Sequence, residues 1–132
     1  MDNALISIKT EPTPQVCKTD YFISKVEQWA KEKGILDKAT PSQQFEKTEE
    51  EFNELKEAMS AYDLGLETFI NSKGESKNTF EEIKDGIGDI TVTLIILSKL
   101  FDTEFGDHLE MVYNIISKRT GTMIDGKFVK DK

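Results

Sequence analysis

The stretch Thr40-Pro41-Ser42-Gln43-Gln44-Phe45 opens a long helical segment and indicates the fold class of the chain. Thr40 is a preferred N-cap residue, Pro41 suits the first helical position, and Gln43 completes a capping box. Beyond this start, apolar residues recur at helical spacing, which predicts a helix as far as Tyr62 or Asp63, before Gly65. The apolar stripe of this helix consists of Phe45, Phe52, Leu55, Met59 and Tyr62.

Three further segments carry the same helical periodicity. They run from about residue 20 to 33, from 80 to about 97, and from about 104 to 118. Thr19 is expected to cap the first of these segments and Gly34 to end it. In the last segment, the side chains expected to face inward are Leu109, Val112, Ile115 and Ile116.

The remaining segments are short or irregular. Residues 64–78 allow a short helix followed by a polar loop. Residues 122–129 are typical of a β-hairpin, because Asp125-Gly126 favours a type I′ turn. Residues 1–18 contain two prolines and no helical period, which indicates an extended N-terminal arm. We therefore expect one all-α domain over residues 19–132, a bundle of about four helices with a short C-terminal β-hairpin.

Composition and charge disfavour several classes of function. The 132 residues carry a formal net charge of −8, which argues against a general nucleic-acid binder. No apolar run reaches the roughly 18 residues of a membrane span, and no secretory signal opens the chain. One cysteine allows no internal disulfide, so the cytoplasm is the expected location. One histidine does not suit a structural zinc site or a di-iron bundle.

Two acidic stripes carry the strongest chemical signal. Glu51 and Glu54 lie on one predicted helix, and Glu82, Asp85 and Asp89 lie on the next. Residues three and four apart share a helix face, so antiparallel packing of the two helices would bring the stripes together. Carboxylates gathered at close range repel one another, and a divalent cation relieves the repulsion. Hard oxygen ligands point to Mg²⁺ or Mn²⁺.

Each acidic residue also has an ordinary structural interpretation, because charged runs on helices usually face solvent. Glu82 fits the capping-box position of its helix, and Asp85 suits the positive end of that helix. Asp89 is harder to explain, since aspartate is a poor helix former in mid-helix. Gly86 and Gly88 flank Asp89, and two helix-interior glycines suggest the close approach of another backbone or a ligand.

Other side chains are candidates for phosphate and base contacts. Lys118 and Arg119, with Asn114, lie near the end of the last predicted helix, where cations are also favoured by the helix dipole. Trp29 offers a ring on which a base can stack, although a tryptophan in an apolar stripe is more often part of the core. His108 best fits a surface position.

With these residues in view, the chain resembles the MazG-like branch of the all-α nucleotide pyrophosphohydrolases over roughly residues 26–129. The resemblance rests on Trp29, Gln44-x-x-Lys47-x-x-Glu50-Glu51-x-x-Glu54-Leu55, Ile87-Gly88-Asp89, and Tyr113-Asn114 to Lys118-Arg119. The closing Met123-Ile124-Asp125-Gly126-Lys127-Phe128-Val129 looks like the phage-encoded members. Those proteins share a Glu-x-x-Glu … Glu-x-x-Asp signature that holds Mg²⁺ for hydrolysis of nucleoside triphosphates to a monophosphate and pyrophosphate.

The second half of that signature departs from the family pattern. If Asp89 is the signature aspartate, Gly86 stands where the glutamate should be. Glu82-x-x-Asp85 fits the same spacing one turn earlier. Either Asp85 and Asp89 share the metal, or Glu82 and Asp85 do.

The resemblance implies a metal-dependent hydrolase of nucleoside or deoxynucleoside triphosphates, with Mg²⁺, or Mn²⁺, as cofactor. The implied metal ligands are Glu51, Glu54 and Asp89, with Asp85 or Glu82. The implied acceptor of the proton from the attacking water is Glu50 or Glu51. The implied substrate contacts are Gln44, Lys47, Asn114, Lys118 and Arg119, with Trp29.

The helix that follows Thr79 has a further property with consequences for assembly. Beyond Asp89 it is apolar on nearly all sides, which is typical of a helix buried on most of its surface. We therefore expect a homodimer or homotetramer formed through this helix, with neither nucleic acid nor membrane as a partner. Two alternatives to the enzyme stay open: a catalytically lapsed relative that binds nucleotide or metal, and a structural helical module that oligomerises.

Overall fold

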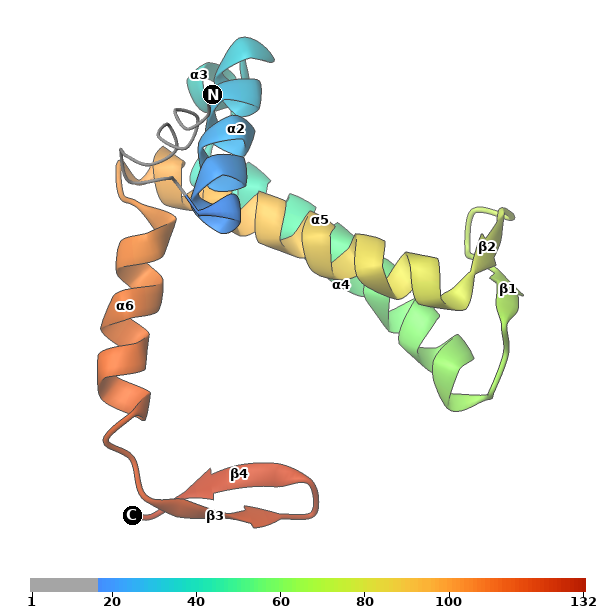
Figure 1. Cartoon of the computed structure of the whole chain (residues 1–132). Coiled ribbons are helices and arrows are strands. Elements are labelled where there is room, and N and C mark those ends of the chain that lie inside the picture. Colours follow the sequence, from blue (N-terminus) through green and yellow to red (C-terminus); the bar gives the residue numbers. More distant parts are fainter. Residues whose placement is uncertain (1–16) are drawn as a thin grey trace, which may run out of the picture.

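The computed structural model describes residues 17–132, which form a mostly helical chain (Figure 1). The helices are α2 (Lys18–Glu32), α3 (Ile35–Lys38), α4 (Pro41–Asp63), α5 (Thr79–Leu100) and α6 (Phe105–Ile116). The expected all-α class is confirmed, with the single turn of α3 added to the four expected helices. Residues 1–16 of the expected N-terminal arm lie outside the described part, and Lys18 already belongs to α2. No helix in residues 17–132 is long and apolar enough to cross a membrane.

Two small antiparallel strand pairs complete the fold. The strands are β1 (Thr68–Ile70), β2 (Ser76–Asn78), β3 (Gly121–Ile124) and β4 (Lys127–Lys130). The β3–β4 hairpin confirms the sequence prediction, because Asp125 and Gly126 at its turn have positive φ angles of 50° and 79°. The β1–β2 hairpin replaces the short helix considered for residues 64–78, so that alternative was wrong.

Helix starts depend on local capping, and the structure agrees with the sequence at one long helix and differs at another. α4 has the predicted cap, with a complete capping box between Thr40 and Gln43. α2 begins before Thr19, because the Sγ atom of Cys17 accepts a hydrogen bond from the backbone N–H of Asp20 at 3.4 Å. The prediction of Thr19 as N-cap was therefore wrong. Gly34 ends α2 as expected, in the left-handed region at φ 80°.

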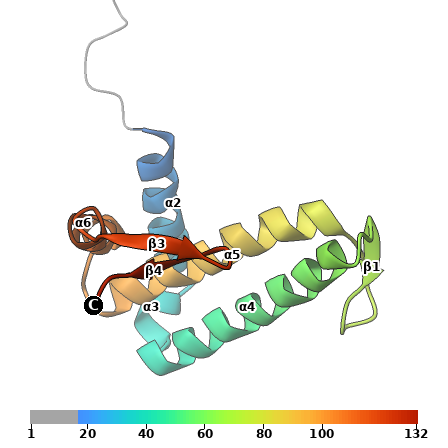
Figure 2. The ribbon, with the colours of Figure 1, turned by 90° about the horizontal axis from the view of Figure 1, so that it is seen from below.

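The antiparallel pair α4–α5 forms the body of the molecule, and the β1–β2 hairpin joins the two helices (Figures 1 and 2). The helices approach closely at Gly86, where a Cβ atom would lie 2.9 Å from Cδ1 of Leu55. A Cβ atom added at Gly88 would have no neighbour within 4 Å. The expected close approach therefore holds at Gly86 and not at Gly88. A buried hydrogen bond also links the two helices, because the side-chain amide of Gln44 donates to the backbone carbonyl of Thr93 at 3.3 Å.

The buried face of α4 is not the predicted apolar stripe. Phe45 and Phe52 are each 53% exposed, whereas the buried α4 residues are Gln44, Ala58 and Ala61. Close packing against one neighbouring helix selects small side chains at the contact, so the large apolar residues are left facing outward.

A second set of apolar residues lies on the C-terminal arm, which we define as residues 105–132. The arm comprises α6, which packs at the end of α5, and the β3–β4 hairpin, and it extends away from the α4–α5 body (Figures 1 and 2). The α6 residues expected to face inward, Leu109, Val112, Ile115 and Ile116, are between 44% and 64% exposed. Within the described chain that prediction was wrong, because among residues 17–132 no element other than the end of α5 packs extensively on α6.

Candidate functional site

The acidic residues of α4 and α5 share one neighbourhood on the helix pair. The charges of Glu54, Asp85 and Glu82 all act on Asp89, and those of Glu54 and Asp89 act on Glu51. The structure therefore brings together the residues of the two predicted stripes. We call this set the acidic cluster; it consists of Glu51, Glu54, Glu82, Asp85 and Asp89.

Glu51 and Asp89 are the most perturbed carboxyl groups of the acidic cluster. Burial raises the pKa of Glu51, whose side chain is 12% exposed, and hydrogen bonding to Lys47 opposes this rise. Partial desolvation also raises the pKa of the more exposed Asp89, and the charges of Asp85 and Glu54 raise it further, while a hydrogen bond with Glu51 opposes the rise. These two groups are thus the ones that gain most from a proton or a cation.

Three lysines provide counter-charges to the acidic cluster. The distances are 3.3 Å from Lys47 Nζ to Glu51 Oε2, 3.4 Å from Lys73 Nζ to Glu54 Oε2, and 3.8 Å from Lys77 Nζ to Glu82 Oε1. Lys47 also lies 3.3 Å from Oε1 of Glu50, and this hydrogen bond is the largest cause of the raised pKa of Lys47. Among the described residues, no lysine or arginine pairs with Asp85 or Asp89, so the α5 side of the cluster keeps an excess of negative charge.

Lys73 and Lys77 come from the β1–β2 hairpin, which sequence reasoning did not connect with the site. The backbone N–H and the hydroxyl of Ser72 both donate to the Glu57 carboxylate at 2.8 Å, which fixes the hairpin loop to α4. Within the loop, Oδ1 of Asn71 accepts hydrogen bonds from the backbone N–H groups of Lys73 and Glu75. The available signal was the pair of short runs around the polar turn 71–75, which allows a hairpin as well as a loop.

The start of α5 changes the interpretation of Glu82. The N-cap of α5 is Asn78, whose side chain accepts from the backbone N–H of Glu81 at 3.0 Å. Thr79 is already helical, and its hydroxyl donates to the Leu66 carbonyl at 2.7 Å. Glu82 therefore does not occupy the capping-box position, and that structural alternative was wrong. Its carboxylate is available to the acidic cluster.

The other predicted site residues lie apart from the acidic cluster. Gln44 is buried between α4 and α5, where its amide serves the packing described above. Asn114, Lys118 and Arg119 are exposed on the C-terminal arm, and within residues 17–132 no hydrogen bond or ion pair links them to the cluster. A single chain therefore does not unite the acidic and the basic candidates.

Trp29, the residue predicted to stack on a base, is neither buried in the core nor fully exposed. Its ring is about half exposed on α2. It lines a shallow apolar groove with Phe22, Lys25 and Val26, and with Val92 of α5. The groove has the apolar character that base stacking requires, and stacking by Trp29 stays a prediction.

The carboxylate oxygens of the acidic cluster are the kind of ligand that a hard cation prefers. The side chains, however, are not gathered around one point. Among residues 17–132, no three or more His, Cys, Asp or Glu side chains are arranged so that they could hold a metal ion. Carboxylate oxygens suit Mg²⁺ or Mn²⁺. Because Glu51, Glu54 and Glu82 are each paired with a lysine, binding of either ion through them would compete with these lysine contacts.

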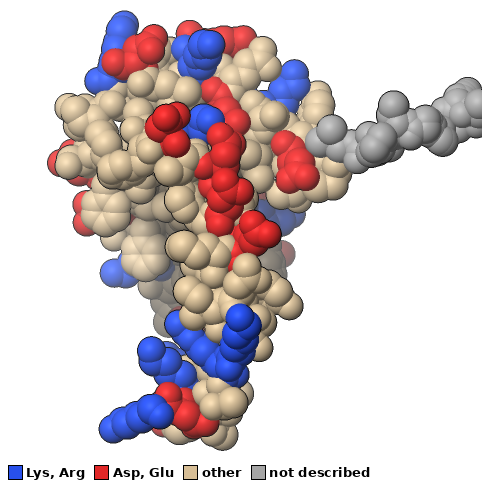
Figure 3. Space-filling model, turned by 90° about the vertical axis from the view of Figure 1, so that its left-hand side faces the viewer, with Lys and Arg blue, Asp and Glu red and all other residues tan. Residues whose placement is uncertain are grey.

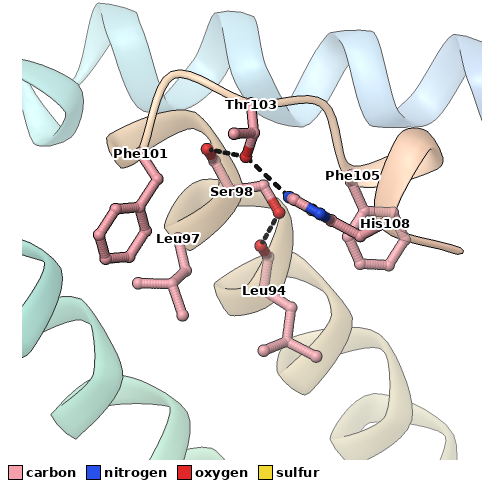
Figure 4. Close-up of a pocket in the computed structure, with 7 residues that line it drawn as sticks. All are labelled: Leu94, Leu97, Ser98, Phe101, Thr103, Phe105 and His108. Carbon is pink, nitrogen blue, oxygen red and sulfur yellow. Dashed lines mark hydrogen bonds between the residues drawn. The ribbon is translucent and has the colours of Figure 1, made fainter. Parts of the chain in front are cut away.

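The wider hollows of the described chain lie away from the acidic cluster. One of about 380 Å³ sits at the elbow between α5 and α6 and is lined by Leu94, Leu97, Ser98, Phe101, Thr103, Phe105 and His108 (Figure 4). The His108 Nε2 atom lies 2.7 Å from the hydroxyl oxygen of Thr103. The walls are mainly apolar and contain no carboxylate, so the acidic cluster is the better candidate for chemistry.

One similar protein comes from a bacteriophage. Over 78 residues the chain is 36% identical to an uncharacterized 18.2 kDa protein in the rep-hol intergenic region of Haemophilus phage HP1 (strain HP1c1). The match covers 59% of this chain and 38% of the phage protein, so the chain spans well under half of that relative. No protein-family model matches the chain, and no solved structure matches it.

Proposed function

We propose that the protein is a metal-dependent hydrolase that converts nucleoside or deoxynucleoside triphosphates to a monophosphate and pyrophosphate. The observation that carries this proposal is the acidic cluster, in which burial and mutual repulsion raise the pKa values of Glu51 and Asp89. Such a set favours a divalent cation, and triphosphates are substrates that bind through one. The resemblance to MazG-like proteins supports the same reaction.

The proposed roles follow the chemistry of each side chain. Mg²⁺, or Mn²⁺, would be held by Glu51, Glu54 and Asp89, with Asp85 or Glu82. When bound, the ion supplies positive charge to the phosphates and polarises the attacking water. Glu51 or Glu50 accepts the proton from that water. Glu51 is the better candidate, since its raised pKa lies closer to neutral pH and Glu50 is exposed and paired with Lys47.

The remaining residues are proposed to contact the substrate. Lys47 lies beside the acidic cluster and is placed to bind phosphate oxygens once the metal compensates Glu50 and Glu51. Lys118 and Arg119 are proposed as further phosphate contacts, with Asn114 and Trp29 toward the nucleoside. Gln44 is assigned to helix packing instead of substrate.

Assembly and location are part of the proposal. Ile87 on α5 is 58% exposed and Leu94 is also exposed, which supports a homodimer or homotetramer formed through α5. The substrate is a small molecule, with no nucleic acid or membrane involved. The phage relative supports action in the cytoplasm of a host cell, where nucleoside triphosphates are available.

Two other functions are favoured by particular observations. A lapsed relative that binds nucleotide or metal without turnover is favoured by Gly86 and by the open arrangement of the carboxylates. A structural module that oligomerises is favoured by the exposed apolar residues of the C-terminal arm.

The deciding experiment is pyrophosphate release from a panel of nucleoside and deoxynucleoside triphosphates, with Mg²⁺, with Mn²⁺ and with EDTA. Metal-dependent release paired with monophosphate is expected for the wild type. Loss of at least tenfold is expected for Glu54→Gln and Asp89→Asn, whereas Glu49→Gln, elsewhere on α4, serves as the matched control. Folded Glu54→Gln and Asp89→Asn proteins with wild-type rates would refute the proposal.

If none of the triphosphates is hydrolysed, thermal melting distinguishes the two alternatives. A rise in melting temperature on adding Mg²⁺ and a nucleotide analogue would identify the lapsed binder. An unchanged melting temperature would favour the structural module.

A further inference from the structure

The C-terminal arm has no buried residue beyond Phe105. Every residue from 106 to 132 is exposed. Ten of these are large apolar side chains that are roughly half exposed: Leu109, Met111, Val112, Tyr113, Ile115, Ile116, Met123, Ile124, Phe128 and Val129. An uncovered surface of this kind is typical of an element whose partner lies outside the chain.

The arm is not stable on its own by the usual rules. α6 has 12 residues, a length at which an isolated helix is marginal in water. An isolated two-stranded hairpin is likewise marginal, and in the described part of the chain β3 and β4 pair with no other strand. α6 packs at its start, where it follows α5, and no other element of residues 17–132 supports the rest of the arm to a comparable extent. Something must therefore cover the arm for it to hold this shape.

The size of the apolar surface matches one half of a dimer interface. If each of the ten side chains offers on the order of 200 Å² and half of it is exposed, the arm presents roughly 1,000 Å². A stable interface buries about 800 Å² on each partner, whereas the largest patch of a monomer is about 300–600 Å². The arm alone is thus large enough to hold two copies together.

Charge indicates that the partner is another copy of this chain. The arm contains five basic and four acidic residues, and all five basic residues lie in its last part, residues 117–132. The whole chain carries a net charge of −8, so the rest of the chain carries −9. In Figure 3, Lys and Arg gather at the lower end of the molecule, where the hairpin lies, and Asp and Glu form a band that runs down its upper and middle part. The basic end of the arm is attracted to the acidic body of a second copy, whereas two bodies alone repel each other.

The body of the second copy also offers apolar surface for the arm. Phe45 and Phe52 on α4, and Phe101 just beyond the end of α5, are all more than half exposed. A hollow lined by Phe45, Thr48, Glu49, Phe52, Asn53 and Ile90 lies on the same helix pair. These apolar side chains can pack against those of the arm, and the neighbouring acidic residues can pair with the basic residues at its end.

We infer that two copies of this chain exchange their C-terminal arms, so that the arm of each packs on the α4–α5 body of the other. The contact is reciprocal, as a two-fold dimer requires. This inference adds a second surface to the proposed contact through α5, and it does not depend on any enzymatic activity.

The first test is the mass of the full-length chain in solution, by light scattering or native mass spectrometry. The expected mass is an even multiple of 15.0 kDa. Ile116→Lys, at the centre of the apolar face of α6, is expected to shift the assembly toward monomer by at least tenfold in dissociation constant. Glu110→Lys, on the opposite face of the same helix, makes a larger charge change and is expected to leave the mass unchanged. A monomeric wild type, or equal effects of the two variants, would overturn the inference.

Exchange of the arms needs a second measurement, which also covers the case in which Ile116→Lys does not fold. Wild-type chains with and without ¹⁵N label are unfolded together, refolded and treated with a carbodiimide, which joins lysines to nearby carboxylates. Cross-links from Lys127 and Lys130 to α4 or α5 are expected to join labelled to unlabelled chains. Cross-links confined to chains of one label would show that each arm folds back on its own body.

Discussion

At residue 89, a carboxyl group is held where its charge is unfavourable. Desolvation first, then the charges of Asp85 and Glu54, raise the pKa of Asp89 in the folded chain. The folded state then binds the proton more tightly than the unfolded state, so stability falls as the pH rises from the ordinary carboxyl range through the raised pKa. Below the ordinary carboxyl range Asp89 is protonated in both the folded and the unfolded state, so its ionisation does not affect the free energy of unfolding.

Asp89→Asn should therefore stabilise the metal-free protein at neutral pH. We expect its melting temperature to exceed that of the wild type by a few degrees at pH 7, and the two to melt alike at about pH 3, below the ordinary carboxyl pKa. Melting followed by circular dichroism in EDTA across this range measures the difference. Asp37→Asn, on α3 and outside the acidic cluster, controls for the loss of one charge. A destabilised Asp89→Asn at pH 7 would contradict this electrostatic account.

Adding Mg²⁺ should reverse the order of these two proteins. The cation relieves the repulsion that the wild type suffers, so its melting temperature should rise with Mg²⁺ concentration. Asp89→Asn has lost one ligand and should respond less. Equal responses of the two proteins would show that Asp89 does not contribute to cation binding.

At residue 86, the glycine is explained by packing. A Cβ atom there would lie 2.9 Å from Cδ1 and 3.0 Å from Cβ of Leu55. Overpacking of this kind costs about 1–3 kcal/mol, against a gain of about 1 kcal/mol in helix propensity. Gly86→Ala should therefore lower the free energy of unfolding by up to about 2 kcal/mol.

Gly88→Ala is the matched control, since a methyl group there meets nothing within 4 Å. It should raise the free energy of unfolding by up to about 1 kcal/mol through helix propensity. Urea unfolding measures both variants. If both gained stability, the spacing of α4 and α5 would not depend on Gly86. A glutamate at residue 86 would meet the same obstacle, which favours Glu82, Asp85 and Asp89 as the α5 ligands.

At the scale of elements, the β1–β2 hairpin determines where two of the counter-charges lie. Its loop is fixed by the two hydrogen bonds from Ser72 to Glu57, and this fixes Lys73 beside Glu54. Hydrogen bonds to a charged group contribute about 1.5–3 kcal/mol, so Glu57→Ala should increase local opening of the loop at least roughly tenfold. Hydrogen exchange of the amides of residues 71–75 measures this opening.

The control for the loop is Glu49→Ala, a carboxylate on α4 that makes no bond to the hairpin. It should leave the exchange of these amides unchanged. Ser72→Ala removes one of the two hydrogen bonds and should have an intermediate effect. Unaltered exchange in Glu57→Ala would mean that the turn formed by Asn71 is sufficient to hold the loop.

The elements that could be predicted from sequence are those fixed by local chemistry. The capping box of α4 and the Asp125-Gly126 turn each involve residues within a few positions of one another. The buried face of α4 could not be predicted, because it depends on how closely α5 approaches at Gly86. The same distinction holds for the site: spacing placed Glu51 and Glu54 on one face, but nothing local indicated lysines from a hairpin.

At the scale of the whole molecule, the position of Arg119 poses the sharpest question. It lies beyond α6 on the C-terminal arm, without a link to the acidic cluster of its own chain in the described structure. If the arms are exchanged and the protein hydrolyses triphosphates, the natural place for this cation is the cluster of the second copy. Each site would then contain the carboxylates and Lys47 of one chain and Arg119 of the other.

This arrangement predicts that two inactive variants restore activity when mixed. Glu54→Gln impairs the acidic cluster, and Arg119→Ala impairs the arm. In a mixed dimer, one site receives both defects and the other receives neither. Random pairing of equal amounts yields half mixed dimers with one intact site of two, so about a quarter of wild-type activity should return after the variants are unfolded and refolded together.

The controls distinguish failure of the shared site from failure of the enzymatic proposal. Full activity of Arg119→Ala alone would remove this residue from the reaction, whatever the assembly. Native mass spectrometry with one variant ¹⁵N-labelled shows whether mixed dimers have formed. If they have formed and both single variants are inactive, activity well below a quarter would place the carboxylates and Arg119 of each site on the same chain. Recovery near a quarter would establish that a site requires two copies, because no single chain in the mixture carries both groups intact.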